Sequence, residues 1–364
     1  MLPPDSTGAL LTIDLDAIAK NYRLLTKRLE PAELHAVVKA DAYGLGIEAI
    51  AKVLASLGCR HFFVATLEEG VALRALLANA EIGVFNGLFA GEEATYIEHR
   101  LIPCLNDLGQ VELFSALLKP AMAGLQIDTG MTRLGLSAND VNRLVTEPER
   151  LSGIFLHYIF SHLACADEPS HSKNAEQLDL FRAHTRRLPP TRLSLANSSG
   201  IFLEQEYHFD FVRAGAAIYG INPQPNHPNP MTQVIGLYGR ILQVRDVDTP
   251  QTVGYGATYC ASGVGRIATV AVGYADGYLR TLGDRGICFV GDRQVPVIGR
   301  ISMDLITIDV TEISPQQIKP NTLVELIGPH HSIDALAAEA GTIGYEILTR
   351  LGHRYHRSYI AKSA

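Results

Sequence analysis

The chain has 364 residues, of which 47% are hydrophobic and 19% charged, and its formal net charge is -7. At about 150 residues per domain, this length predicts two or three domains with cores of their own. Such a composition excludes a disordered or fibrous chain. The acidic balance argues against a nucleic-acid partner, because binding phosphates requires clustered Lys and Arg.

The five cysteines are scattered along the chain and form no CxxC pair. This pattern supports neither a disulfide framework nor a structural zinc site. The start of the chain lacks the pattern of a signal peptide, and no apolar run reaches the roughly 18 residues needed to cross a bilayer. We therefore expect a cytoplasmic protein with no membrane segment.

Between about residues 34 and 230, short apolar runs alternate with amphipathic patterns such as 46–58, 67–78 and 174–188. This alternation is typical of βαβ units around a parallel sheet. Eight such units predict an α/β fold of the (β/α)8 barrel type. The predicted strands are 34–38, 62–65, 82–85, 102–105, 121–127, 154–160, 193–195 and 211–212.

After Pro230 the pattern changes to strand-like alternation with glycine-rich turns, and a short capped helix is predicted only at Ser332. We therefore predict a barrel domain over residues 1–230 and a mainly β domain over residues 231–364. Residues 12–25 read as one strand and one helix, and this opening strand is a candidate for the β domain.

Barrels of this kind carry their chemistry at the carboxyl ends of the strands. Strands stop where polarity resumes, so a single asparagine at such a position carries little information. Lysine, histidine and arginine at three strand ends are more informative. The residues at or just past the predicted strand ends are Lys39, Asn86, Asn106, Asp128, His162, Asn197 and Arg213.

The most informative segment is 36–46, AVVKADAYGLG, in which an apolar strand ends on Lys39. Burial of a lysine at the mouth of a barrel lowers its pKa and makes its amine nucleophilic, which suits a Schiff base. Read alone, the segment also fits a lysine whose stem packs on the barrel rim while its amine stays in water.

This segment resembles the lysine motif of the pyridoxal-phosphate-dependent alanine racemases. The resemblance implies a (β/α)8 barrel followed by a mainly β domain, with pyridoxal phosphate bound to Lys39. It also implies that the protein interconverts L- and D-alanine through an external aldimine. The further segments that carry the resemblance are 128–135, 161–167, 196–199, 212–216, 253–259, 272–277, 299–304 and 344–346.

For the cofactor phosphate, the resemblance implies hydroxyl groups from Tyr43, Ser198 and Tyr345, with backbone N–H groups from Gly215 and Ala216. These last two residues follow the eighth predicted strand, where barrels often bind phosphate. Without the resemblance, Ser198 could equally be a helix N-cap, and the tyrosines could be packing residues.

By the same resemblance, Arg213 faces the pyridine nitrogen. A guanidinium keeps its proton, so it donates to this nitrogen and leaves the ring neutral, which limits side reactions such as transamination. His162 is expected to orient Arg213 through a hydrogen bond. Read alone, Arg213 also fits a surface ion pair, and His162 fits a satisfied core histidine.

Racemisation is simplest with two bases on opposite faces of Cα. The resemblance assigns Lys39 to the D-enantiomer and Tyr255 to the L-enantiomer, across a head-to-tail homodimer that shares its active sites. The second subunit is expected to supply Tyr274, which narrows the entrance, and Met303, whose N–H supports the substrate carboxylate. Arg133 is expected to bind that carboxylate or the phenolic oxygen of the cofactor.

Two positions depart from the family pattern. Gln126 stands where many members have a carbamylated lysine, so only a neutral amide is available to hydrogen-bond Arg133. Ser194 stands where histidine is common, which puts a longer hydrogen-bond chain behind His162 in doubt. The histidines at 330–331 and 353–356 lack accompanying ligands at a recognised spacing, and we expect no metal.

The sequence therefore predicts a racemase that makes D-alanine for peptidoglycan. The nearest alternative is a broader amino-acid racemase that also accepts serine. A decarboxylase of similar plan is disfavoured by Arg213, since decarboxylation benefits from a protonated ring. A cofactor carrier without activity is disfavoured by the β domain with Tyr255.

Overall fold

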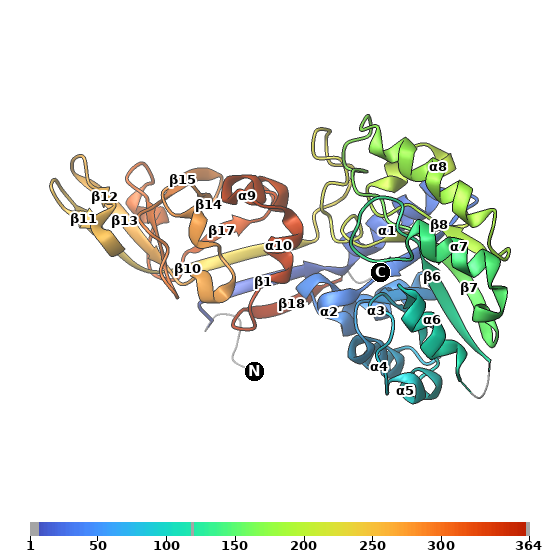
Figure 1. The fold of residues 1–364 in the computed structure, drawn as a ribbon. Coiled ribbons are helices and arrows are strands. Elements are labelled where there is room, and N and C mark those ends of the chain that lie inside the picture. The colour runs from blue at the N-terminus through green and yellow to red at the C-terminus, as the bar shows by residue number, and fades with distance from the viewer. Residues whose placement is uncertain (1–6, 118–119, 362–364) are drawn as a thin grey trace. The chain divides into compact units, whose positions relative to one another are not determined.

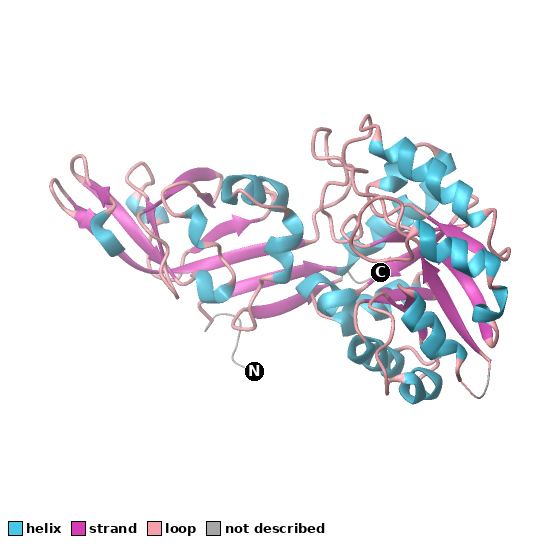
Figure 2. Ribbon diagram, viewed as in Figure 1, coloured by secondary structure: helices cyan, strands magenta, loops and turns pink. Residues whose placement is uncertain are grey.

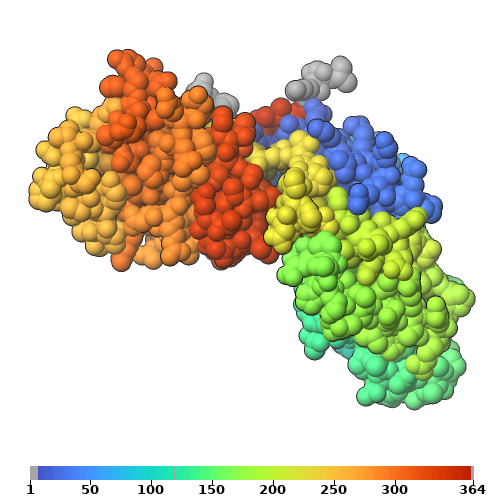
Figure 3. All heavy atoms as spheres, turned by 90° about the horizontal axis from the view of Figure 1, so that it is seen from above, coloured from blue at the N-terminus to red at the C-terminus, as the bar shows by residue number. Residues whose placement is uncertain are grey.

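The computed structural model describes residues 7–117 and 120–361, and the chain forms two units (Figure 1). One is Ile18–Thr232, and the other joins Met1–Ala17 to Gln233–Ala364. The structure thus divides the chain after residue 232 and gives the opening strand to the second unit. In the space-filling view, the orange and red C-terminal residues form one continuous body (Figure 3).

The first unit contains eight parallel strands in the order β8-β7-β6-β5-β4-β3-β2-β9. The sheet closes where Asp210 N donates to Leu193 O at 3.1 Å and Arg213 N donates to Ala196 O at 3.0 Å. The predicted barrel is therefore confirmed. Its strands are β2 (Glu33–Val37), β3 (His61–Val64), β4 (Glu81–Val84), β5 (Ile102–Leu105), β6 (Ala121–Gln126), β7 (Ile154–Phe160), β8 (Arg192–Ser194) and β9 (Phe211–Ala214).

Aromatic rings fill the barrel interior. Phe63, Tyr158 and Phe211 pack against one another, with ring centroids 5.6 to 6.4 Å apart. Gly124 leaves the room that these rings need, because a Cβ there would lie 2.0 Å from the Tyr158 ring. The barrel is thus a packed core, and ligands can bind only at its ends.

Helices surround these strands (Figure 2). Polar side chains begin several of them, as in α4, where Thr66 and Glu69 form a capping box. The predicted helices at 46–58, 67–78 and 174–188 match α3, α4 and α8. The helices are α1 (Leu15–Leu29), α2 (Lys39–Gly44), α3 (Ile47–Ser56), α4 (Leu67–Leu76), α5 (Glu93–Glu98), α6 (Leu108–Ser115), α7 (Ala138–Thr146) and α8 (Lys173–Thr185).

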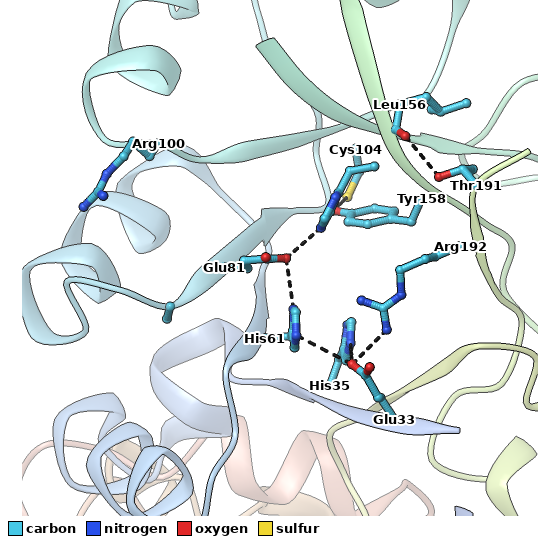
Figure 4. A network of polar contacts seen from close by, with 12 residues as sticks. Glu33, His35, His61, Glu81, Arg100, Cys104, Leu156, Tyr158, Thr191 and Arg192 are labelled. Carbon is cyan, nitrogen blue, oxygen red and sulfur yellow. Dashed lines mark hydrogen bonds and ion pairs between the residues drawn. The ribbon is translucent and has the colours of Figure 1, made fainter. Parts of the chain in front are cut away.

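The amino end of the barrel carries a polar network (Figure 4). Glu81 Oε2 lies 3.0 Å from His61 Nδ1 and 2.6 Å from His157 Nε2. Glu33 Oε2 lies 2.8 Å from Arg192 Nη2. Because Glu33, His61, Glu81 and Arg192 are the first residues of their strands, the network ties strand starts together at the end opposite Lys39.

Glu33, His35 and His61 offer three metal-ligand atoms within 4.8 Å of one another. The two imidazole rings, however, stack at 4.2 Å with an interplanar angle of 8°. Their nitrogen lone pairs therefore run side by side and do not converge on one point, as a tetrahedral metal would require. The Arg192 guanidinium also occupies Glu33 Oε2. We interpret the cluster as a stacked ion-pair network.

The second unit is mainly β, as predicted, and is built around the long strand β10 (Ile235–Val247). Its sheet has the order β13-β16-β15-β14-β17-β10-β1-β18, with a further pairing of β13 to β10. The remaining strands of this sheet are β1 (Ala9–Asp14), β13 (Gly265–Val270), β14 (Ile287–Val290), β15 (Arg293–Ile298), β16 (Ile306–Asp309), β17 (Leu323–Ile327) and β18 (His356–Ile360).

Two helices, α9 (Ile333–Ala340) and α10 (Gly344–Thr349), belong to this unit. The Ser332 hydroxyl caps α9 by accepting from Ala335 N at 3.1 Å, as the sequence predicted. A small hairpin joins β11 (Thr252–Val253) to β12 (Tyr259–Cys260). None of the described helices combines the length and apolar composition that spanning a membrane requires.

Candidate active site

Lys39 begins α2 (Lys39–Gly44) at the carboxyl end of β2, and the backbone that follows it is left-handed. Residues 40–43 all have φ between 54° and 56°. Each such non-glycine residue costs about 1–2 kcal/mol, so neighbouring groups must hold the turn. Glu69 does so by accepting from Ala40 N at 2.6 Å, and Asp41 accepts from Ile47 N at 2.7 Å. Backbone strain of this kind concentrates at functional sites.

The Lys39 amine lies 5.7 Å from the centre of the Phe85 ring. Burial lowers its pKa, the Arg133 charge lowers it further, and Glu69 acts in the opposite direction. Both dominant effects favour the neutral amine, which is the nucleophilic form.

Arg213, on β9, is buried, and hydrogen bonds hold both of its terminal nitrogens. Its Nη1 donates to the Ser194 hydroxyl, and its Nη2 donates to the carbonyl oxygens of Ser161 and Leu195. Burial lowers its pKa to about 10, so it stays charged near neutral pH. Its Nε is buried and has no hydrogen-bond partner within the described part of the chain. The site therefore contains a spare, fixed N–H donor.

His162 lies close enough to Arg213, Arg133 and Lys39 for their charges to affect it. Burial first, and then these three charges, lower its pKa to about 3, so the imidazole is neutral. The expected hydrogen bond from His162 to Arg213 is not found; Ser194 and backbone carbonyls orient the guanidinium instead. Ser194 thus takes part in the network directly.

Behind these residues lies a buried amide that sequence reasoning missed. Gln177 Nε2 donates to His162 O at 2.9 Å and to Thr129 Oγ1 at 3.1 Å. Thr129 Oγ1 in turn lies 2.7 Å from Ser161 Oγ. Gln177 therefore supports the backbone that carries His162 and the carbonyl that holds Arg213. The sequence of α8 is rich in polar residues, so nothing in it indicates that this glutamine is buried.

Ser198 and Gly215, which follow the last two strands, form a polar cradle with Tyr43, which lies on α2. Ser198 Oγ accepts from Gly215 N at 3.0 Å and Ala217 N at 3.2 Å, so it is not a helix N-cap. A Cβ at position 215 would lie 2.3 Å from the Tyr43 hydroxyl. Ala216 is buried between the two donors. Hydroxyl and backbone N–H groups gathered in this way suit a phosphate.

Asp128 shapes the loop that carries Arg133. Its Oδ1 accepts from the N–H groups of residues 130–132 at 2.9–3.0 Å. Gln126 Nε2 donates to Leu134 O at 3.2 Å. The neutral amide thus bonds the backbone next to Arg133, and the guanidinium stays exposed.

The other predicted site residues lie in the β unit. Tyr255, Tyr274 and Met303 are exposed by 70%, 43% and 54%. Tyr255 begins a turn flanked by positive φ angles at Gly254 and Gly256. Tyr345 lies on α10. The described structure thus gathers Lys39, Tyr43, Arg133, His162, Ser198, Arg213, Gly215 and Ala216 in the barrel and leaves three large side chains exposed in the other unit.

Comparison with family models accounts for both units. The model described as "Alanine racemase, N-terminal domain" matches residues 13–223, and the one described as "Alanine racemase, C-terminal domain" matches residues 234–359. The chain belongs to the alanine racemase family. This confirms the family and the enzyme class that the sequence motifs implied, a pyridoxal-phosphate-dependent racemase.

Curated relatives match along nearly their whole length. The alanine racemase of Rhodospirillum rubrum is 48% identical over 361 residues, which cover 98% of this chain and 96% of the relative. That of Brucella ovis is 47% identical over 373 residues, covering 98% and 94%.

Solved structures agree with the described fold. The alanine racemase of Bartonella henselae, solved with covalently bound pyridoxal phosphate, has a TM-score of 0.94 and 40% identity and covers 97% of this chain and 100% of that one. The biosynthetic alanine racemase of Pseudomonas aeruginosa has a TM-score of 0.92 and 33% identity, covering 98% and 100%.

Proposed function

We propose that the chain interconverts L- and D-alanine by a two-base mechanism and supplies D-alanine for peptidoglycan. Full-length similarity to proteins named alanine racemase supports the substrate. Similarity to a racemase named biosynthetic supports the cellular role. The five cysteines are all free, which suits the reducing cytoplasm.

The observation that carries the proposal is the spare Nε of buried Arg213, in the same unit as the Lys39 amine and the Ser198 cradle. A pyridine nitrogen can accept a hydrogen bond from Arg213 Nε, an aldehyde can react with the Lys39 amine, and a phosphate can bind in the Ser198 cradle. The residues present therefore fit pyridoxal phosphate. The remaining groups proposed to hold it are Tyr43, Arg133, His162, Gly215, Ala216 and Tyr345.

When bound, the cofactor withdraws electrons from the substrate Cα and makes its proton removable. Lys39 Nζ, whose pKa is lowered by burial and by Arg133, takes or delivers this proton on one face. The Tyr255 hydroxyl does so on the other. A base is most effective when its pKa lies near the working pH, so the buried position of Lys39 favours this role.

Arg213 sets the protonation of the cofactor ring. Its guanidinium stays charged, since its pKa is about 10, so Nε donates a hydrogen bond and cannot accept one. Arg213 Nε would therefore give a pyridine nitrogen a hydrogen bond but no proton. We propose that this limits transamination and favours rapid return of the proton to Cα.

The exposed side chains of the β unit support a head-to-tail homodimer. The side chains of Tyr255, Tyr274 and Met303 are exposed and so available to a partner subunit. We propose that each subunit places them in the active site of its partner. There Met303 N–H and Arg133 bind the substrate carboxylate, and Tyr274 restricts the substrate to small side chains.

The test is chiral chromatography after incubating cofactor-loaded protein with L-alanine, and separately with L-serine. The proposal predicts a racemic mixture of alanine and slow reaction of serine. Equal rates on both would favour the broader racemase, and L-alanine left unchanged would refute the function. Co-expressed Lys39→Ala and Tyr255→Phe chains should regain activity in proven heterodimers, and failure there would reject the shared site.

A further inference from the structure

Two loops of the β unit carry exposed side chains that the proposed function places at the substrate. Loop 273–277 carries Tyr274, and loop 302–305 carries Met303. Backbone N–H groups of the first loop donate to carbonyl oxygens of the second at 2.9 and 3.1 Å. The loops also touch at Gly273, where a Cβ would lie 2.3 Å from Met303 O. A shift of either loop therefore moves the other.

Arg354 joins the same two loops through their carboxylates. Its Nε and Nη2 donate to Asp276 at 2.7 and 2.9 Å, and its Nη1 donates to Asp304 at 2.7 Å. These side-chain bonds raise the pKa of the guanidinium above its ordinary value. Only arginine has the planar fork of donors that can span two carboxylates in this way. We call these three residues the Arg354 clamp.

The two arms of the clamp differ in burial, because the Arg354 side chain is 50% exposed and Asp304 56%, whereas Asp276 is buried. The Asp276 side chain is only 7% exposed, and its Oδ2 also accepts from Gly273 N at 2.9 Å. Removing Arg354 would leave a largely buried carboxylate without a cation, which is strongly unfavourable. The geometry of loop 273–277 therefore depends on this pairing.

The segment after α10 fixes the clamp to the rest of the unit. Gly352 N donates to Asp276 O at 3.0 Å. Gly277, with φ of +97°, leaves room for Arg350 O, which would lie 2.1 Å from a Cβ at that position. Because α10 also carries Tyr345, the same packed region carries Tyr274, Met303 and Tyr345.

We propose that Arg354 is a positioning residue that determines selectivity for alanine over larger amino acids. The inference rests on the proposed function. A wall can reject the added hydroxyl group of serine only if it does not yield, and Tyr274 and Met303 are exposed residues on loops. The Arg354 clamp adds side-chain hydrogen bonds to the backbone hydrogen bonds that join the two loops, and so opposes their displacement.

The test compares Arg354→Lys, Arg354→Ala and Asp304→Asn with the wild-type enzyme. Asp304 is 56% exposed, so its change opens one arm of the clamp without leaving a buried charge. Arg150→Lys is the matched control, because Arg150 also pairs with two carboxylates, Glu147 and Glu112, in the barrel unit. The measurements are kcat and KM for alanine and serine, cofactor absorbance, and amide hydrogen exchange in the two loops.

We expect the ratio of kcat/KM for alanine to that for serine to fall about tenfold in Arg354→Lys and further in Arg354→Ala. In Asp304→Asn it should fall about threefold. The alanine KM should rise more than kcat falls, and the cofactor absorbance should not change. Amide exchange should accelerate in residues 273–277 and 302–305. The control should behave as wild type.

Unchanged selectivity in folded, cofactor-loaded Arg354→Lys and Asp304→Asn would overturn the inference. Amide exchange that does not change in these variants would overturn the claim that Arg354 restrains the two loops. A wild-type enzyme inactive on both amino acids would overturn the proposed function and the selectivity with it, while the exchange data would still decide whether Arg354 holds the loops.

Discussion

Replacing Gly215 with alanine tests the phosphate cradle. A Cβ there would lie 2.3 Å from the Tyr43 hydroxyl, whereas ordinary contact begins at 3.4 Å. The ring must therefore move by about 1 Å, against its packing on Tyr219 at 4.7 Å. Overpacking of this kind costs about 1–3 kcal/mol. If the whole cost falls on cofactor binding, affinity decreases about 5- to 150-fold.

The assay is titration of cofactor-free protein with pyridoxal phosphate, followed by absorbance, with urea unfolding of the cofactor-free form. Gly263→Ala is the matched control, because a Cβ there would have no neighbour within 4 Å. Gly215→Ala should lower the affinity for pyridoxal phosphate, the stability of the cofactor-free protein, or both. Affinity and stability both equal to those of the control would refute the cradle.

Three further changes probe charge and protonation. Arg213→Glu should slow racemisation on the order of 10²-fold and raise the share of transamination, measured as pyruvate formed per racemisation event; an unchanged share would contradict the role of Arg213. Since the pKa of His162 falls from 6.5 to about 3 on folding, the unfolded state binds more protons between these values, and stability should decrease as pH falls through that range. Urea unfolding of His162→Gln should show a shallower acid slope, and an equal slope would contradict the assignment. Hydrogen bonds from its two histidine partners, His157 and His61, hold the pKa of Glu81 below its ordinary range. Glu81→Gln should therefore lower the free energy of unfolding by about 0.5–1 kcal/mol near neutral pH, and by progressively less below pH 4.5. A loss of stability that does not shrink in acid would contradict this role of Glu81.

Much of the barrel could be predicted from sequence. Its eight strands lie within two residues of the predicted ends, because buried parallel strands read as apolar runs between helical patterns. Lys39 and Arg213 could be found for a related reason, since the predicted strands place them at the carboxyl end of the barrel, where barrels carry their chemistry. Their roles came from the resemblance and not from the pattern.

The supporting contacts could not be predicted. Residues 40–43 include two alanines, which give no sign of a left-handed backbone. Gln177 looks like a surface residue until the helix is seen against the barrel. Arg354 lies 78 residues from Asp276 and 50 from Asp304 along the chain, and only the folded sheet brings them together. Such long-range contacts leave no local signature.

The most direct test of the account is to locate the cofactor on the chain. Borohydride reduction makes the link between pyridoxal phosphate and its lysine permanent, and mass spectrometry of a digest then identifies that lysine. The added mass should be found on the peptide that carries Lys39, and not on the peptide that carries the exposed Lys319. The same mass on another lysine, or on no peptide of cofactor-loaded protein, would contradict it.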